Sequence, residues 1–251
     1  MRDRPANPLM AFYADCGVTH HLYETPQNRF EEVLAPPPAV PAAPAPQEDD
    51  EVGDARRLAA GAQTLADLHA AMAAFTGCPL KETARAMCPG EGPVGAPMMF
   101  IGEAPGRDED REGRPFVGRS GELLEKMVAA LGYSRHEVYI TNVIPWRPPE
   151  NRTPSPIETA TCEPFVRREI ALVSPKVVVP LGGPSAKLLL RAEQGIMRLR
   201  GKFLRYEDDA VSLPARALFH PAYLLRQPAE KKLAWRDLCA IKDLLDGRTT
   251  A

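Results

Sequence analysis

Four short apolar runs recur along the chain, at residues 97–103, 137–144, 176–182 and 216–220. Each has the length of a strand, and the segments between and after them have helical spacing, at 120–132, 155–173, 184–191 and 230–245. Apolar strands that alternate with helices are typical of a parallel sheet covered on both faces. We therefore expect an α/β fold of three layers, in which helices cover both faces of a central four-stranded parallel sheet.

Capping residues define the ends of two of these helices. Ser155 fits an N-cap, Pro156 fits the first turn, and Glu158 completes a capping box. Gly132 is expected to end the helix at 120–132.

The regular pattern is missing before residue 64. Residues 35–51, APPPAVPAAPAPQEDDE, are rich in Pro and Ala with an acidic end, and such a segment buries too little apolar surface to fold. Helical spacing begins with LADLHAAMAAF at 65–75. We therefore expect a partly disordered N-terminal extension at 1–63, which includes the linker at 35–51, and a folded domain at 64–251.

Composition then narrows the class of protein. The 251 residues are 44% apolar and 25% charged with a net charge of −2, so any nucleic-acid contact must come from a local basic patch. The sequence has no run of 18 apolar residues that could cross a membrane. Its first residues, MRDRPANPLM, lack the apolar core of a signal peptide. The odd number of cysteines, five, favours reduced thiols over a disulfide framework. These features predict a cytoplasmic protein without membrane contacts.

The expected strands end in residues that could face a ligand. Parallel sheets bind ligands at the carboxyl ends of their strands, so the residues at these ends should gather around one crevice. They are Gly102, Glu103, Asn142, Gly182, Gly183 and His220.

Each polar residue of this set also has a plain structural explanation. Glu103 could belong to a solvated acidic loop, although a carboxylate just after a buried strand is poised for acid–base work. Asn142 could cap a turn or read the amide edge of a pyrimidine base. His220 could be structural, or it could stabilise negative charge that develops on a carbonyl oxygen.

The segment after His220 has two interpretations. Tyr223, Leu224 and Leu225 either fold back on the core or wedge into a base stack, with Arg226 on a phosphate. Other basic residues could form a phosphate-facing rim, although exposed arginine is common and each is weak evidence alone. They are Arg119, Arg147, Arg152, Lys187, Arg198, Arg200 and Lys202.

Taken in order, five segments resemble one family: GEAPGRDEDREGRPFVGRSGELL, YITNVIPWRPPENRTP, VVVPLGGPSAKLLL, IMRLRGKF and HPAYLLRQP. They are similar to the thermophile-type bacterial uracil-DNA glycosylases, the fourth family of that superfamily, whose members normally hold a 4Fe–4S cluster. The resemblance spans about residues 65–245. It implies the three-layer fold of these enzymes and a monomeric catalytic domain that flips uracil out of single- or double-stranded DNA. Hydrolysis of the N-glycosidic bond would then start base excision repair.

The resemblance also implies roles for single residues. Phe116 would stack on the flipped base, Asn142 would read the uracil edge, and His220 would hydrogen-bond a carbonyl oxygen of the departing base. The whole uracil pocket would comprise Gly102, Glu103, Ala104, Phe116, Asn142 and His220. The DNA contacts would come from Arg147, Arg152, Gly183, Ser185, Arg200, Tyr223, Leu224, Leu225 and Arg226.

The first motif departs from that of the best-known uracil glycosylases. Ala104 replaces their water-holding aspartate, so Glu103 and Glu109 join Asn142 and His220 as catalytic candidates. Gly106 replaces the tyrosine that excludes thymine, so action on other deaminated bases stays open. Because no Lys-Arg-Arg insertion precedes the histidine, we expect ordinary turnover rather than a stable DNA adduct.

Two of the four cluster cysteines that the resemblance implies are replaced. Cys78 and Cys162 match ligand positions, whereas Phe75 and Trp146 occupy the other two, and neither ring can bind iron. Cys88 could substitute, but it lies in a Pro/Gly loop. We therefore expect no metal and no cofactor, with Trp146 packed inside the protein.

Two other functions stay open at this point. The chain could be a non-catalytic protein that binds DNA or uracil on the same scaffold, or a glycosylase that acts on xanthine, hypoxanthine or a mismatch. The joint presence of Glu103, Phe116, Asn142 and His220 favours the uracil glycosylase, because a pure binder would not need all four.

Overall fold

The computed structural model describes residues 48–209 and 211–249. The chain divides into two compact units, Met1–Pro46 and Gln47–Ala251, and every described element belongs to the second. Most of the predicted linker at 35–51 lies outside the described residues, but its last residues form the start of helix α2 (Glu48–Gly61). Ala55 and Ala59 of this helix are buried in the core, so the predicted domain boundary at residue 64 lies too far along the chain.

A five-stranded sheet forms the centre of this unit, in the order β2-β1-β3-β5-β4. The first four strands of that order are parallel, which confirms the predicted α/β class, and β4 runs antiparallel to β5 at the edge. The strands are β1 (Met98–Gly102), β2 (Tyr139–Asn142), β3 (Val177–Pro180), β4 (Leu204–Glu207) and β5 (Ser212–Ala215).

The sequence analysis missed the edge strand and placed the last parallel strand a few residues too late. β4 is a short strand with largely exposed side chains, and β5 contains Pro214, which weakens any strand pattern. The segment predicted as the last strand, 216–220, follows β5 and continues along β3. The Arg216 and Leu218 N–H groups donate to the Val178 and Pro180 carbonyl oxygens at 3.0 and 2.9 Å, and Leu218 also forms a parallel bridge with Leu181.

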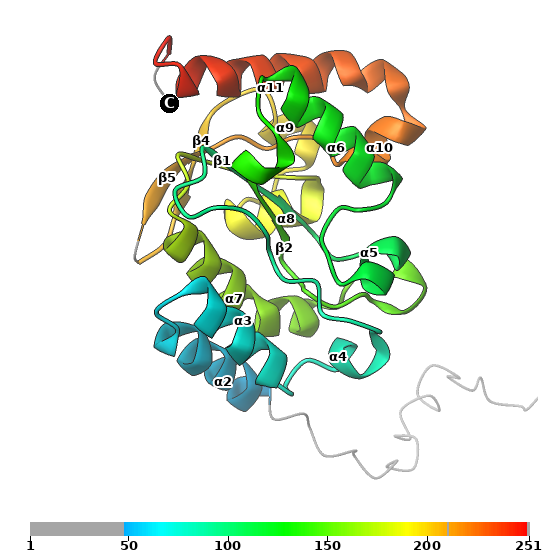
Figure 1. The fold of residues 1–251 in the computed structure, drawn as a ribbon, viewed down its shortest axis with the longest axis vertical. Helices are drawn as coiled ribbons and strands as arrows, with labels where there is room; N and C mark the ends of the chain where they lie inside the picture. The colour runs from blue at the N-terminus through cyan, green and yellow to red at the C-terminus, as the bar shows by residue number, and fades with distance from the viewer. Residues whose placement is uncertain (1–47, 210, 250–251) are drawn as a thin grey trace, which may run out of the picture. The chain divides into compact units, whose positions relative to one another are not determined.

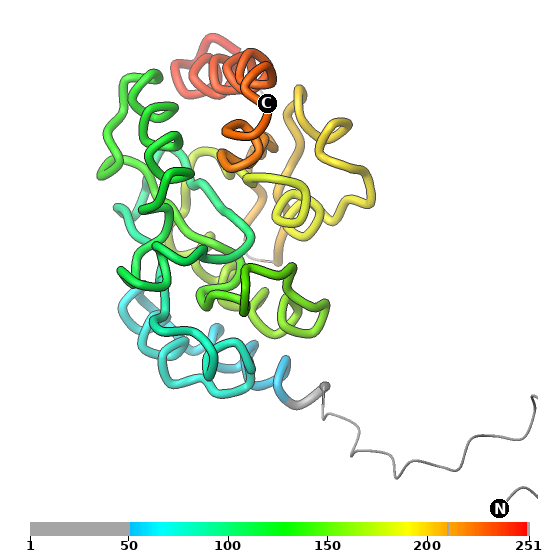
Figure 2. The backbone as a smooth tube through the Cα atoms, turned by 90° about the vertical axis from the view of Figure 1, so that its right-hand side faces the viewer, coloured from blue at the N-terminus to red at the C-terminus, as the bar shows by residue number. Residues whose placement is uncertain are grey.

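Helices cover both faces of the sheet, as predicted (Figure 1). On one face lie α6 (Arg119–Ala130), α10 (Pro221–Arg226) and α11 (Lys231–Leu245), packed on Met98 and Phe100 of β1. On the other lie α2, α3 (Leu65–Ala74) and α7 (Pro156–Val173), packed on the alternate β1 side chains. Figure 2 shows the same separation after a rotation, with α11 at the top and α2 and α3 at the bottom.

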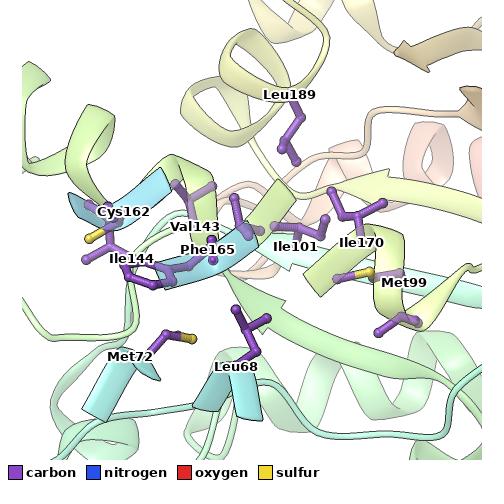
Figure 3. Close-up of a cluster of buried hydrophobic side chains, with 14 of the residues drawn as sticks. Leu68, Met72, Met99, Ile101, Val143, Ile144, Cys162, Phe165, Ile170 and Leu189 are labelled. Carbon is purple, nitrogen blue, oxygen red and sulfur yellow. The ribbon is translucent and has the colours of Figure 1, made fainter. Parts of the chain in front are cut away.

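The core on the α7 side contains the positions that the sequence analysis singled out for the cluster. Trp146 is 2% exposed and Phe75 is 5% exposed, and both lie in one buried group with Cys78 and Cys162. The ring of Phe75 meets that of Phe165 edge to face, with 5.2 Å between centroids. Figure 3 shows part of this group, including Cys162, Ile144 and Met72. The burial predicted for Trp146 is confirmed.

The predicted helix ends are also confirmed. Ser155 caps α7, where its Oγ accepts from the Glu158 backbone N–H at 3.3 Å and the Glu158 carboxylate accepts from the Ser155 N–H at 2.7 Å. Gly132 follows the end of α6 with a φ of 84°. Short elements complete the unit: α4 (Leu80–Thr83), α5 (Arg107–Glu112), η2 (Arg135–Glu137), η3 (Pro149–Asn151), α8 (Gly183–Leu189), α9 (Ile196–Leu199) and η4 (Pro228–Glu230). No helix between residues 48 and 249, residue 210 aside, is long and apolar enough to cross a membrane.

A buried ionic group fastens α11 to the rest of the unit. Asp237 is fully buried and accepts hydrogen bonds from the guanidinium of Arg200 at 2.8 Å and from that of Arg216 at 2.8 and 3.0 Å. The two arginines come from the segment after α9 and from the segment after β5. Three separate segments therefore meet at one carboxylate.

We predict that Asp237→Ala destabilises the protein strongly, because two largely buried guanidinium groups lose the carboxylate that pairs with both. Breaking such a group typically costs about 3–5 kcal/mol in the free energy of unfolding. Urea unfolding followed by circular dichroism measures this. Asp243→Ala on the same helix is the matched control, since it removes only the exposed pair with Arg248 and should leave the midpoint nearly unchanged. Equal midpoints for the two variants would contradict the assignment.

Candidate active site

One cavity of about 790 Å³ opens at the carboxyl ends of the parallel strands. It lies where the sequence analysis expected a crevice, and its wall includes residues at the ends of β1, β2 and β3 and residues of the segment that follows β5. Its walls include Glu103, Ala104, Glu109, Phe116, Asn142, Gly183, Phe219, His220, Tyr223 and Arg226. The predicted pocket residues therefore come together, apart from Gly102, which lies beneath the wall.

Asn142 is the last residue of β2 and lies level with Gly102 of β1. A side-chain carbon at Gly102 would come within 2.2 Å of the Asn142 Oδ1, so glycine is required for the amide to lie across the neighbouring strand. The Asn142 side chain is almost fully buried, and within residues 48–209 and 211–249 it has no hydrogen-bond partner. Its donor and its acceptor are both available to a ligand in the cavity.

His220 is the N-cap of α10, and its Nδ1 accepts a hydrogen bond from the Ala222 backbone N–H at 3.1 Å. A nitrogen that accepts carries no proton, so the neutral ring has its N–H at Nε2. Burial and the nearby positive charge of Arg226 together lower the pKa of His220 to about 4. The carboxylate of Glu109 opposes them with a smaller effect. At neutral pH the residue is therefore an uncharged hydrogen-bond donor in the cavity wall.

The two carboxylates proposed to hold water differ in their surroundings. Glu109 is buried, and its oxygens accept from three backbone N–H groups, those of Gly106, Val117 and Gly118, at 3.0 to 3.1 Å. Glu103 lies in the same cavity, and its carboxylate has no hydrogen-bond partner within the described ranges. Burial raises the pKa of Glu103 above its usual range. Glu109 holds the loop in place, and Glu103 has the carboxylate that is free for other work.

Phe116 contributes a ring to the cavity from a strained piece of backbone. Its φ is 53°, a left-handed conformation that costs a non-glycine residue on the order of 1–3 kcal/mol. The ring centroid lies 5.6 Å from that of His220 at an angle of 33°, so the two rings form one aromatic surface. This arrangement suits a flat ligand that stacks on the ring while its edge faces Asn142 and His220.

Three of the residues predicted to contact DNA have side chains that are engaged inside the protein. Ser185 is 1% exposed and its hydroxyl donates to the Ile101 carbonyl oxygen at 2.7 Å, so it fixes α8 to the sheet. Arg200 is engaged in the buried group around Asp237. Leu224 is 1% exposed and packs in the core, which leaves Tyr223 and Leu225 as the partly exposed apolar residues of this helix. The sequence pattern could not show the burial of Leu224, because a helix of six residues has no clear period.

The remaining basic candidates lie at the mouth of the cavity or on the nearby surface. Arg226 and Arg152 line it, although Arg152 also forms a two-point pair with Glu158 at 2.6 and 2.8 Å. Arg119 and Arg147 line a second hollow of about 420 Å³ together with Arg107, which the sequence analysis did not single out. Lys187, Arg198 and Lys202 are exposed elsewhere on the surface.

Sequence reasoning also missed several residues of the cavity wall. Ser120, Asn151 and Met197 line it, and Met197 is 60% exposed at its rim. This exposure is visible only in the structure, since an apolar residue in a segment such as IMRL is normally expected in the core.

The cluster position does not fit iron. A 4Fe–4S cluster needs four thiolates, and the described residues contain no group of three or more side chains able to hold a metal. The thiol of Cys78 has a lowered pKa and that of Cys162 a raised one, chiefly because the two share a hydrogen bond. The Cys88 thiol points elsewhere, since it donates to the Glu109 carbonyl oxygen at 3.2 Å, and burial raises its pKa to about 12. Cys16 lies outside the described residues.

Comparison with known proteins identifies the family of this chain. Residues 89–239 match the family described as the uracil DNA glycosylase superfamily. The Type-4 uracil-DNA glycosylase of Sulfurisphaera tokodaii is 40% identical over 161 residues, which cover 62% of this chain and 73% of that protein. The proteins of the same name from Pyrobaculum aerophilum and Thermotoga maritima are 38% and 40% identical, with 64% and 60% of this chain and 84% and 78% of those proteins covered.

The matched range includes every residue of the cavity wall and all five strands. Since it also spans more than half of the sequence, the chain belongs to the uracil DNA glycosylase superfamily.

Proposed function

We propose that the protein is a uracil-DNA glycosylase that flips uracil out of DNA and hydrolyses its N-glycosidic bond, the first step of base excision repair. The observation that carries this is the cavity itself. Its wall combines the ring of Phe116, the neutral imidazole donor of His220, and the amide of Asn142 and carboxylate of Glu103, which have no partners among the residues that the structure describes. Several Type-4 relatives at 36–40% identity support the same activity.

Base recognition rests on Phe116 and Asn142. The ring of Phe116 supplies a flat surface for a base that has left the helix. The Asn142 amide offers a donor and an acceptor at a spacing that matches a carbonyl oxygen and the adjacent N–H on the edge of uracil. Cytosine presents a different order of donors and acceptors, so it leaves at least one of these groups unpaired in a buried site.

Bond cleavage rests on His220. As the bond from base to sugar breaks, negative charge grows on uracil and positive charge on the sugar. A neutral Nε2–H that donates to a uracil carbonyl oxygen stabilises this charge more strongly than it stabilises the intact nucleotide. The N-cap bond at Nδ1 holds the ring in this tautomer before the substrate arrives.

The water is assigned to Glu103. Glu103 lines the cavity and its carboxylate has no hydrogen-bond partner among the described residues, whereas the Glu109 carboxylate accepts from three backbone N–H groups. A carboxylate can accept a hydrogen bond from the attacking water and face the positive charge of the sugar. Catalysis then needs Glu103 in its ionised form.

We further propose that the enzyme works without iron, as a monomer in the cytoplasm of a bacterium, and accepts uracil in single- or double-stranded DNA. Phe75 and Trp146 at two ligand positions support the first point. Tyr223, Leu225 and Arg226, partly or fully exposed beside the cavity, would enter the base stack and hold a phosphate. Gly106 presents no side chain to the cavity, which favours some action on hypoxanthine or xanthine as well.

We predict that His220→Ser lowers uracil release by about 100- to 1000-fold, since it removes the donor to the departing base. Serine is a good N-cap, so α10 keeps its first hydrogen bond and the variant should fold. Single-turnover excision from a uracil oligonucleotide, read by alkaline cleavage of the abasic site, measures the loss. Cys239→Ser on α11 is a control that should keep full activity. Normal rates in His220→Ser would refute the assignment, and no excision by the unaltered protein would favour the non-catalytic alternative.

We predict that kcat/KM shows no inflection near pH 6.5, because His220 stays neutral until the pH approaches 4. The fall of kcat/KM at acid pH should instead have its midpoint above pH 4.5, the ordinary pKa of glutamate, because burial raises the pKa of Glu103. Protonation of Glu103 removes the negative charge that the reaction needs. Activity therefore falls as the pH falls through that pKa. The Glu103→Gln variant should be slow and should lack this fall at acid pH, and an unchanged fall in that variant would contradict the role.

We predict that the purified protein is colourless and holds far less than one cluster's worth of iron, and that chelators leave its melting temperature unchanged. Iron and sulfide analysis, with an absorption spectrum, checks this. The double variant Phe75→Cys/Trp146→Cys, reconstituted without oxygen, is the positive control and should take up iron and turn brown. Stoichiometric iron in the unaltered protein would overturn the proposal.

A further inference from the structure

Side chains on both sides hold the backbone around Phe116, and one of them lies outside the cavity wall. Arg135, in η2, donates from Nη1 to the Phe116 carbonyl oxygen at 2.8 Å and from Nη2 to the Pro115 carbonyl oxygen at 2.5 Å. Its side chain is only 10% exposed, and it does not line the cavity. We propose that Arg135 is a positioning residue for base stacking, which holds Phe116 in the left-handed conformation that turns its ring into the site.

A second set of contacts fixes Arg135 itself. Its Nε donates to Glu91 Oε1 at 2.6 Å, and its Nη1 also donates to Glu125 at 3.0 Å. Glu91 exchanges two backbone hydrogen bonds with Ile140 of β2, at 2.9 and 3.0 Å. Through Glu91, the guanidinium is tied to the same strand that ends in Asn142, so the stacking ring and the amide that reads the base share one support.

The other sides of the Phe116 backbone are closed. A side-chain carbon at Gly121 would lie 1.8 Å from the Phe116 carbonyl oxygen, so this oxygen rests directly on the first turn of α6. Beyond the phenylalanine, the N–H groups of Val117 and Gly118 are bound by Glu109. Arg135 thus binds the carbonyl oxygens of residues 115 and 116, and Glu109 binds the N–H groups of residues 117 and 118. Two charged side chains therefore hold the strained backbone of Phe116 from both sides.

A guanidinium suits this role better than an ammonium group. Its planar fork reaches two successive carbonyl oxygens and two carboxylates at once, whereas lysine has a single charged nitrogen on a flexible stem. Lysine would keep the charge beside Glu91 but leave at least one of the two carbonyls without its donor. The ring of Phe116 would then move by a fraction of an ångström or more, and displacements of about 1 Å at an active site cost up to about 100-fold in rate.

The inference deepens the proposed uracil excision and rests on it for its kinetic test. We expect Arg135→Lys to lower kcat/KM on a uracil oligonucleotide by about tenfold or more at temperatures well below melting. Arg114→Lys is the matched control. Arg114 also binds Glu91, at 2.9 and 3.1 Å, but is half-exposed and does not contact the Phe116 backbone. It should change kcat/KM by less than about twofold.

A double-mutant cycle separates positioning from general loss of structure. In a Phe116→Leu background there is no stacking ring to position, so adding Arg135→Lys should change kcat/KM by less than about threefold. An equal factor in both backgrounds would overturn the inference, as would an equal loss in Arg114→Lys.

A readout without catalysis keeps the two proposals distinguishable. With 4-fluorophenylalanine at position 116, the fluorine resonance of the free protein should shift or broaden in Arg135→Lys and stay in place in Arg114→Lys. An unchanged resonance in Arg135→Lys would defeat the positioning role even if the enzyme is active. If the unaltered protein excises no uracil, the proposed function fails, and the fluorine result still decides the role of Arg135.

Discussion

The carboxylate of Glu109 holds together the loop on which the rest of the site depends. It accepts N–H groups from Gly106 at one end and from Val117 and Gly118 at the other, so residues eleven and twelve positions apart are joined at a single buried group. Between these points the chain turns through α5, returns to the sheet and presents Phe116. Without this closure neither the ring nor the first turn of α6 would have a defined position relative to β1.

The general architecture could be predicted from the sequence because its signals are local. Apolar strands such as VVVP and the capping box at Ser155 each specify their own structure, and both are found where expected. β4 and β5 carry weaker signals, because exposed side chains in one and Pro214 in the other obscure the period of two. The start of the folded unit was placed too late since the acidic end of the linker also forms the first turn of α2.

The sequence predicted which residues gather at the site more readily than it predicted their hydrogen-bond partners and burial. Asn142, His220 and Glu103 follow strands, and parallel topology alone brings strand ends together. The neighbouring sequence gives no sign that Ser185 donates a hydrogen bond to Ile101 or that Arg200 forms an ion pair with Asp237. Each partner lies 37 or more residues away in the sequence. The same limit hid Arg135, whose partners Glu91 and Phe116 are 44 and 19 residues distant.

His220 is the N-cap of a helix only six residues long. So short a helix has little stability of its own and depends on Leu224 and its neighbours for its place. If α10 frays on heating, the Ala222 N–H leaves Nδ1 and the imidazole is free to rotate and to exchange its proton between the two nitrogens. The chemistry would then cease through local unfolding while the sheet and both helical layers remain intact, so the temperature limit of the enzyme would be set by one turn of helix rather than by the core.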